Sequence, residues 1–242
     1  MNAVRSELLK LVGLPSVWAA VAVGLLVPPL VTLLNGTPPD PAGTADAGFQ
    51  ELALGVVGAI ILGVVAIGNE YSAAGEESGG TRQIATSLTA VGSRGRFLVA
   101  KTAALVLTVA SLAAVSAAAT MTVTRIVLGD RAPAPTAGRL LGVILYWVLT
   151  ALLAYGITLL TRSGVLPLAI LILNTSVVSV SFLLSRAVPA AGYLPDLAGA
   201  HMFIHRIVSP VDIAPVTGGV VMAAWVVALL SAAGFVFHRR DA

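Results

Sequence analysis

Long uninterrupted apolar segments constrain this chain more than any other feature of its sequence. A run of about twenty apolar residues can cross a bilayer core of about 30 Å as a helix. Such runs recur along the 242 residues, of which 57% are hydrophobic and only 10% are charged. An ordinary soluble domain carries about 25% charged residues. Because a backbone in lipid must satisfy its own hydrogen bonds, each run is predicted to be a helix. The sequence therefore predicts an all-α, multi-pass membrane protein.

We predict six transmembrane helices within one membrane domain that covers residues 1–242. Each apolar run ends at a polar, glycine-rich or proline-rich connection. The predicted spans are Pro15–Leu34, Phe49–Gly68, Leu98–Val123, Leu140–Thr161, Gly164–Ser185 and Val216–Phe237. Pro167 is expected to kink the fifth span near its start, because proline cannot donate a backbone hydrogen bond. On the second span, Gly55, Ala59 and Gly63 form a ridge of small residues that suits either a subunit interface or packing within one chain.

Residues 1–13 are predicted to form a short helix at the membrane interface before the first span. Its apolar positions share one helical face, while the charged residues lie elsewhere; the apolar set is Val4, Leu8, Leu11 and Val12. The apolar run that follows is longer than the 7–15 residues or so of a secretory signal, and no clear A-x-A cleavage site closes it. We therefore expect a first span that is retained.

The basic residues in the connections predict the orientation of the chain. With both termini in the cytoplasm, nine of the 14 basic residues, including both lysines, lie on the cytoplasmic side. This bias is the one expected of cytoplasmic loops. The abundance of alanine, glycine and valine suggests a bacterial origin, so we expect the bacterial inner (plasma) membrane. The basic residues are dispersed among short loops, and no nucleic-acid partner is predicted.

No aspartate or glutamate lies in the middle of a predicted span. Ion-coupled transporters place ionisable groups at depth to bind the driving ion, so transport by this chain is expected to be energised by another subunit. Cysteine is absent, and no set of residues suits catalysis, so the chain is not expected to be an enzyme. His201 and His205 have i, i+4 spacing, but without a third ligand they make only a weak metal site, and none is predicted.

The segment GRFLVAKT, residues 95–102, differs from the phosphate-binding pattern G-x-x-x-x-G-K-[ST] only at Ala100. The working motif follows a strand, however, whereas this segment leads directly into the third predicted span. Nucleotide binding is therefore not predicted, and we expect no cofactor on this chain.

The polar connector of residues 69–97 contains a predicted amphipathic helix. After the breaker Gly79–Gly80, the apolar residues Ile84, Leu88 and Val91 recur at i, i+4 and i+7 within residues 81–91. In the predicted orientation this helix lies in the cytoplasm between spans two and three. It would either receive a partner protein or lie inertly at the interface, with its basic residues only setting the topology.

The connector resembles that of permeases in the ABC-2 family of ATP-binding-cassette transporters. In that family an acidic residue follows span two, a glycine-threonine pair opens a short coupling helix, and a basic cluster with a lysine enters span three. The matching residues here are Glu70 or Glu77, Gly80, Thr81, Arg82, Arg94, Arg96 and Lys101, and Glu76, Ile84 and Leu88 complete the residues expected to couple to an ATPase. Many members carry a proline before the basic cluster, where this chain has Val91–Gly92.

The resemblance implies a half-transporter of the exporter type. Two permeases, either two copies of this chain or this chain with a homologous permease, would pair within membrane lipid. They would bind two ATPase subunits, which would carry the ATP and Mg²⁺. The resemblance also implies a re-entrant segment in the extracellular connector of residues 186–215.

The substrate expected from this resemblance is a hydrophobic or amphipathic drug, peptide or lipid. Asn174, Ser176 and Ser179 make the fifth span polar, and they would line its path or bond to neighbouring helices. Two alternatives stay open, a lantibiotic-type self-immunity pump and a membrane sensor or anchor that transports nothing.

Overall fold

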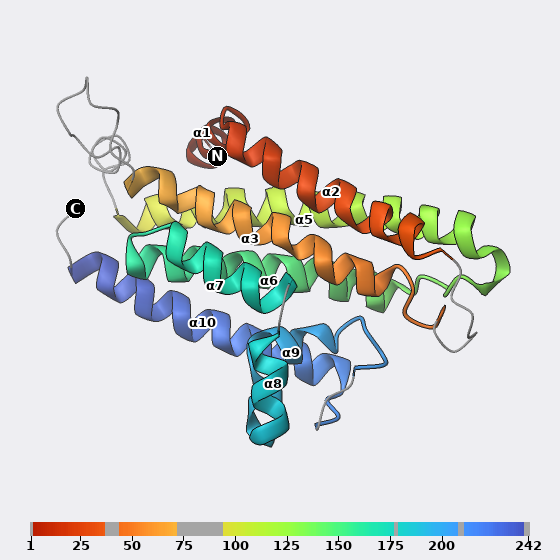
Figure 1. Ribbon diagram of the computed structural model, residues 1–242. Helices are drawn as coiled ribbons and strands as arrows, with labels where there is room; N and C mark the ends of the chain where they lie inside the picture. The colour runs from red at the N-terminus through yellow and green to blue at the C-terminus, as the bar shows by residue number, and fades with distance from the viewer. Residues whose placement is uncertain (1, 37–43, 72–93, 177–178, 208–210, 240–242) are drawn as a thin grey trace.

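A computed structural model describes residues 2–36, 44–71, 94–176, 179–207 and 211–239, which are helical and contain no strand (Figure 1). The helices follow each other as α1 (Asn2–Val12), α2 (Pro15–Asn35), α3 (Phe49–Tyr71), α5 (Arg94–Leu128), α6 (Ala137–Thr161), α7 (Val165–Ser176), α8 (Val180–Ala187), α9 (Pro195–Ala200) and α10 (Pro215–Arg239). Short 3-10 turns, η3 (Gly129–Arg131) and η4 (Pro189–Tyr193), follow α5 and α8. The coupling helix expected over residues 81–91 lies outside the described residues.

Five of these helices are long and apolar enough to cross a membrane, which makes the chain a multi-pass membrane protein by length and composition. They are α2, α3, α5, α6 and α10, and they contain the predicted spans one, two, three, four and six. The helix α5 is the longest, with 35 residues. At 1.5 Å per residue it extends about 52 Å, well beyond a hydrocarbon core of about 30 Å.

The fifth predicted span is not one continuous helix. The helices α7 and α8 meet at an angle of 62°, and together they count as a sixth membrane span only if the bent pair is one broken crossing. Ser179 begins the new helix, because its Oγ accepts a hydrogen bond from the backbone N–H of Phe182 at 3.1 Å. Pro167 lies in the first turn of α7, where a helix tolerates proline, so the bend is not at the predicted place.

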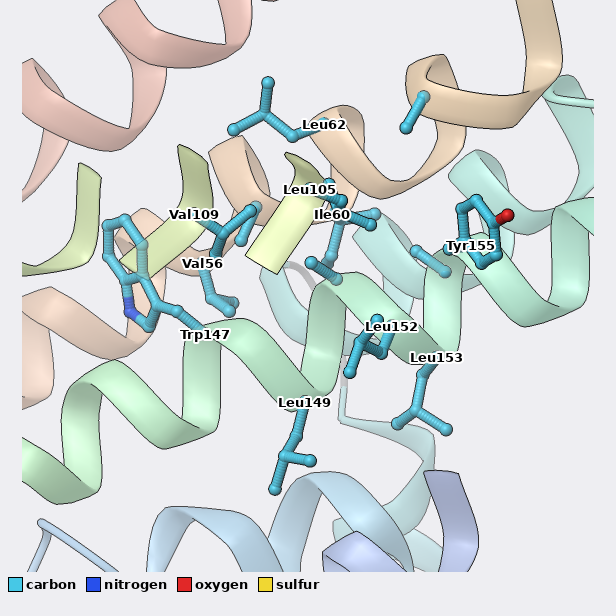
Figure 2. Close-up of a cluster of buried hydrophobic side chains, with 14 of the residues drawn as sticks. Val56, Ile60, Leu62, Leu105, Val109, Trp147, Leu149, Leu152, Leu153 and Tyr155 are labelled. Carbon is cyan, nitrogen blue, oxygen red and sulfur yellow. The ribbon is translucent and has the colours of Figure 1, made fainter. Parts of the chain in front are cut away.

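The core lies where α3 packs against both α2 and α6 (Figure 1). Figure 2 shows Val56 and Ile60 of α3 beside Val109 of α5, with Trp147 of α6 closing one side of the cluster. The indole Nε1 of Trp147 donates a hydrogen bond to the carbonyl oxygen of Leu52 at 3.0 Å. Because this buried ring both fills space and has its N–H satisfied, it fixes the position of α6 on α3.

The small-residue ridge of α3 packs within the chain. Gly55, Ala59 and Gly63 are all buried. A Cβ atom on Gly63 would lie 2.2 Å from the carbonyl oxygen of Ala151 in α6, and one on Gly55 would meet Pro28 and Trp147. Small residues at these positions allow α3 to lie close to α2 and α6. Both neighbouring helices belong to the same chain. Of the two readings left open by the sequence, packing within one chain is the one that the structure supports.

The N-terminal helix α1 packs against α5, but its buried face differs from the predicted one. Leu11 is buried as expected, whereas Val12 is 56% exposed. Glu7, expected on the polar face, is only 4% exposed. Glu7 is buried because it forms an ion pair with Lys101 inside the bundle.

The connector after α8 returns to the bundle instead of extending away from it. Met202 and Phe203 are buried, and a Cβ atom on Gly142 of α6 would lie 2.6 Å from the carbonyl oxygen of Met202. The short helix α9 also packs against α10. The described residues of this connector contain the short helix α9, with Met202 and Phe203 in the buried turn that follows it, and the re-entrant segment stays a prediction.

Candidate functional site

A buried ion cluster lies at the end of the bundle where α1, the end of α3 and the start of α5 meet (Figure 1). Lys101 of α5 is at its centre. The Nζ atom of Lys101 lies 2.7 Å from Glu7 Oε2 and 2.9 Å from Glu70 Oε1. Glu7 is 4%, Glu70 3% and Lys101 5% exposed. One ammonium group therefore joins three helices whose residues are far apart in the sequence.

The cluster is close to electrically neutral. Lys10 contributes a second ammonium group, whose Nζ lies 2.7 Å from Glu7 Oε1, so two lysines face two glutamates. Buried charges are costly unless they are paired and hydrogen-bonded. Burial by itself would raise the pKa of Glu7, but the hydrogen bonds and positive charges of Lys10 and Lys101 outweigh it and hold the pKa below its ordinary value. Glu7 is therefore an ionised acceptor.

Two of the residues expected to couple to an ATPase, Glu70 and Lys101, lie in this cluster. Arg96 is on the exposed face of α5, and Arg94 begins that helix. The remaining expected residues lie outside the described part of the chain: Glu76, Glu77, Gly80, Thr81, Arg82, Ile84 and Leu88. Sequence reasoning missed Glu7, whose only signal was a carboxylate three residues before Lys10 on an otherwise amphipathic helix.

A second buried ion pair lies near the opposite end of the bundle. Arg139 Nη2 is 2.5 Å from Asp46 Oδ1, and both side chains are buried. The guanidinium also donates to the carbonyl oxygens of Phe203 at 2.8 Å and Ala45 at 3.2 Å, and its Cζ lies 3.6 Å from the centroid of the Phe49 ring. From the sequence, Arg139 was expected only to be one of the five basic residues outside the cytoplasm.

The carboxylate of Asp46 organises the returning connector. Its Oδ1 accepts the backbone N–H of His205 at 3.1 Å, and its Oδ2 accepts that of Arg206 at 2.8 Å. The pair with Arg139 thus ties together the start of α3, the start of α6 and the turn after α9. The contacts of Asp46 and Arg139 are all with other parts of the same chain, so we assign this cluster a structural role.

A mostly apolar cavity of about 320 Å³ lies beside the break between α7 and α8. Asn174 reaches across the break, where its Nδ2 lies 2.8 Å from Asp196 Oδ2 and its Oδ1 accepts the backbone N–H of Ser181 at 3.2 Å. Of the residues expected to line a substrate path, Asn174 lines this cavity. Ser179 instead caps α8, and the structure does not describe the side chain of Ser176. Asp196 was not among the expected residues.

The two histidines of the connector have different surroundings. His201 is buried, with Nδ1 2.8 Å from the carbonyl oxygen of Leu197, whereas His205 is exposed. Over the described ranges, no three residues of the types His, Cys, Asp and Glu lie close enough together to hold a metal ion.

No protein-family model matches this chain, and no curated protein is significantly similar to it.

Proposed function

We propose that this chain is the membrane-spanning permease subunit of an ATP-driven exporter of the ABC-2 type. It would form the substrate pathway as a pair of permeases, driven by separate ATPase subunits bound at the cytoplasmic face of a bacterial inner membrane. The resemblance of residues 69–101 to ABC-2 permeases supports the proposal. So does the small number of charged groups within the five long apolar helices.

The observation that carries the proposal is the ion cluster of Glu7, Glu70 and Lys101. Glu70 is the next-to-last residue of α3, and Lys101 lies two turns into α5, so the two residues lie on either side of residues 72–93 of the connector. Their ion pair, at 2.9 Å, joins the end of α3 to the start of α5. A force applied to the connector would therefore act on α3 and α5 together instead of on one helix.

The N-terminal helix α1 belongs to the same mechanical unit. Glu7 joins it to Lys101 at 2.7 Å, so α1 would move with α5 when a partner displaces the connector. The cluster would in this way transmit ATP-driven closure of the partner subunits into the spans. Because α5 extends about 52 Å at 1.5 Å per residue, a tilt at its cytoplasmic end would reach the opposite side of the membrane.

The first test is purification of the full chain from its native host in a mild detergent, followed by mass spectrometry of the proteins that accompany it. We expect a nucleotide-binding ATPase in an amount roughly equal to that of the chain. If the chain purifies alone or only with itself, the proposal loses its source of energy. A membrane sensor or anchor would then be the better description.

The second test reverses charges on the connector. In the Arg82→Glu, Glu77→Lys double variant, we expect loss of ATPase co-purification and of ATP-dependent transport, because the charges that would face the partner are inverted. The matched control is Arg125→Glu, which inverts an exposed charge in the last turn of α5, at the other end of that helix. Intact transport in the double variant would contradict the coupling role of the connector.

A further inference from the structure

The cavity beside the break between α7 and α8 combines an apolar wall with a single acidic group. Its walls come from five helices and the turn before α9. The residues that line it include Leu153, Ile170, Leu171, Val180, Leu184 and Met222. The carboxylate of Asp196 lies among these apolar side chains. Cavities of about 300–1,000 Å³ with apolar walls and a few convergent polar groups are the usual form of small-molecule sites.

Among the described residues, no basic side chain balances the charge of Asp196. Its contact in the described residues is the hydrogen bond from Asn174 Nδ2 at 2.8 Å, and the described part of the chain supplies no basic side chain within ion-pair distance of it. Asp196 differs in this respect from Glu7, Glu70 and Asp46, each of which forms an ion pair with a lysine or an arginine. An ionisable group at an apolar site without a counter-charge favours a ligand that brings one.

The cavity also contains an aromatic ring. Tyr146 lines it, is 5% exposed, and is held at 5.2 Å, centroid to centroid, against the ring of Phe203. The close packing of α9 keeps this ring in place, because a Cβ atom on Gly199 would lie 2.8 Å from Tyr146 Cδ2. A cation above an aromatic face is attracted by the ring quadrupole, and the attraction increases when the cation is desolvated.

Access to the cavity is available from the apolar surface of the bundle. Val180 is 60%, Ile170 54% and Leu184 47% exposed, and all three also line the cavity. In a membrane-spanning chain these side chains face lipid or another permease. A hydrophobic ligand dissolved in the bilayer could therefore enter without crossing a polar barrier.

From these observations we infer that the cavity binds a lipophilic organic cation, with its charge at Asp196 and its apolar groups against Tyr146 and the walls of α7 and α8. This inference rests on the proposed function for its meaning, since it names the class of substrate that the exporter would carry. Binding itself requires only the cavity, and it is measured on the purified full chain without an ATPase.

The test measures binding of radiolabelled methyltriphenylphosphonium to the purified chain reconstituted in lipid nanodiscs. The uncharged analogue triphenylphosphine oxide serves as the matched probe. We expect saturable binding of the cation, and Asp196→Asn should weaken it at least tenfold while leaving the weak binding of the neutral analogue unchanged. Asp196→Glu should retain most of the affinity, because it keeps the negative charge.

Two further variants make the result specific to the cavity. Asp130→Asn removes an equal charge from an exposed position in η3, outside the cavity, and should bind the cation as the unmodified chain does. Val180→Phe adds bulk at a lining position that is already 60% exposed, so the helix should tolerate it while the cavity is partly filled. We expect it to weaken cation binding without changing any charge. It also tests the inference if Asp196→Asn fails to fold.

Several outcomes would overturn the inference. They are no saturable binding of the cation, equal binding by the unmodified chain and by Asp196→Asn, or equal affinity for the charged and neutral probes. If an ATPase co-purifies but the cation does not bind, this inference fails and the proposed function stands. If the cation binds through Asp196 but no ATPase is found, the cavity is confirmed and the exporter proposal fails.

Discussion

Lys101 and Glu7 are separated by 94 positions in the sequence, yet Nζ of the lysine lies 2.7 Å from Oε2 of the glutamate in the buried part of the bundle. The same ammonium group contacts Glu70 at 2.9 Å. The N-terminal helix is thereby attached to α3 and α5, the two helices on either side of residues 72–93 of the connector.

Removal of the central charge should destabilise the protein strongly. Lys101→Met leaves Glu7 and Glu70 buried beside each other with one lysine, Lys10, near the rim. Removal of one partner from a buried ion pair costs about 3–5 kcal/mol. We expect a loss of that size in the free energy of unfolding, measured in mixed micelles. The control is Lys10→Met, whose side chain is 43% exposed, so the loss should be about 0–1 kcal/mol. Equal effects of the two variants would show that Lys101 is not the centre of the cluster.

Stability should depend on pH through Glu7. Its pKa in the folded chain lies below the ordinary value of 4.5, because Lys10 and Lys101 stabilise the carboxylate against the opposing effect of burial. The stabilisation is therefore fully present above about pH 4.5 and is lost as the pH falls through the lower, folded pKa. We expect the apparent melting temperature to fall less between pH 5 and pH 3 in Glu7→Gln than in the unmodified chain. Parallel curves for the two proteins would contradict this assignment.

Asp46 and Arg139 should be energetically coupled. Asp46→Asn leaves the guanidinium of Arg139 without its counter-charge, and Arg139→Gln leaves the carboxylate with only backbone donors. In a double-mutant cycle of unfolding free energies, contacting residues of this kind give interaction energies of about 0.5–3 kcal/mol. Arg131→Gln, at an exposed position of η3, serves as the control and should change stability by no more than about 0.5 kcal/mol. An additive cycle would mean that the two side chains act independently.

The close approach of α3 and α6 should not tolerate a methyl group. In Gly63→Ala the new Cβ would lie 2.2 Å from the carbonyl oxygen of Ala151, so the helices must separate. Overpacking of this kind costs about 1–3 kcal/mol. Gly234→Ala in α10 is the matched control, because no atom lies within 4 Å of the added Cβ, and its stability should not decrease. If both variants were equally stable, a glycine at position 63 would not be required for the packing of α3 against α6.

The positions of the long helices could be predicted from the sequence because lipid leaves few choices. An apolar run of sufficient length must be helical across the bilayer, so the predicted spans one, two, four and six begin and end within three residues of α2, α3, α6 and α10. The prediction was least accurate for α5, which is longer than its apolar stretch at both ends. Its first turns carry Arg96 and Lys101, and hydropathy does not indicate that a charged segment continues a helix.

The break between α7 and α8 could not be predicted, because serine and asparagine occur both inside spans and at helix ends. Only the contacts distinguish the two cases. Ser179 caps α8, and Asn174 bonds to Asp196, which lies 22 positions further along the chain. The same limit applied to Asp196 itself, which the sequence places in an ordinary polar connector.

The sequence alone determined that this chain is a bundle of membrane-crossing helices, because the length of an apolar run and the cost of an unpaired backbone group in lipid are local properties. Only the tertiary structure decided which charges meet. Glu7, Glu70 and Lys101 are brought together by the packing of α1, α3 and α5, whereas Asp196 has no basic side chain within ion-pair distance among the described residues. Pairing of charges depends on distances between segments far apart in the chain, and no pattern within a single segment encodes them.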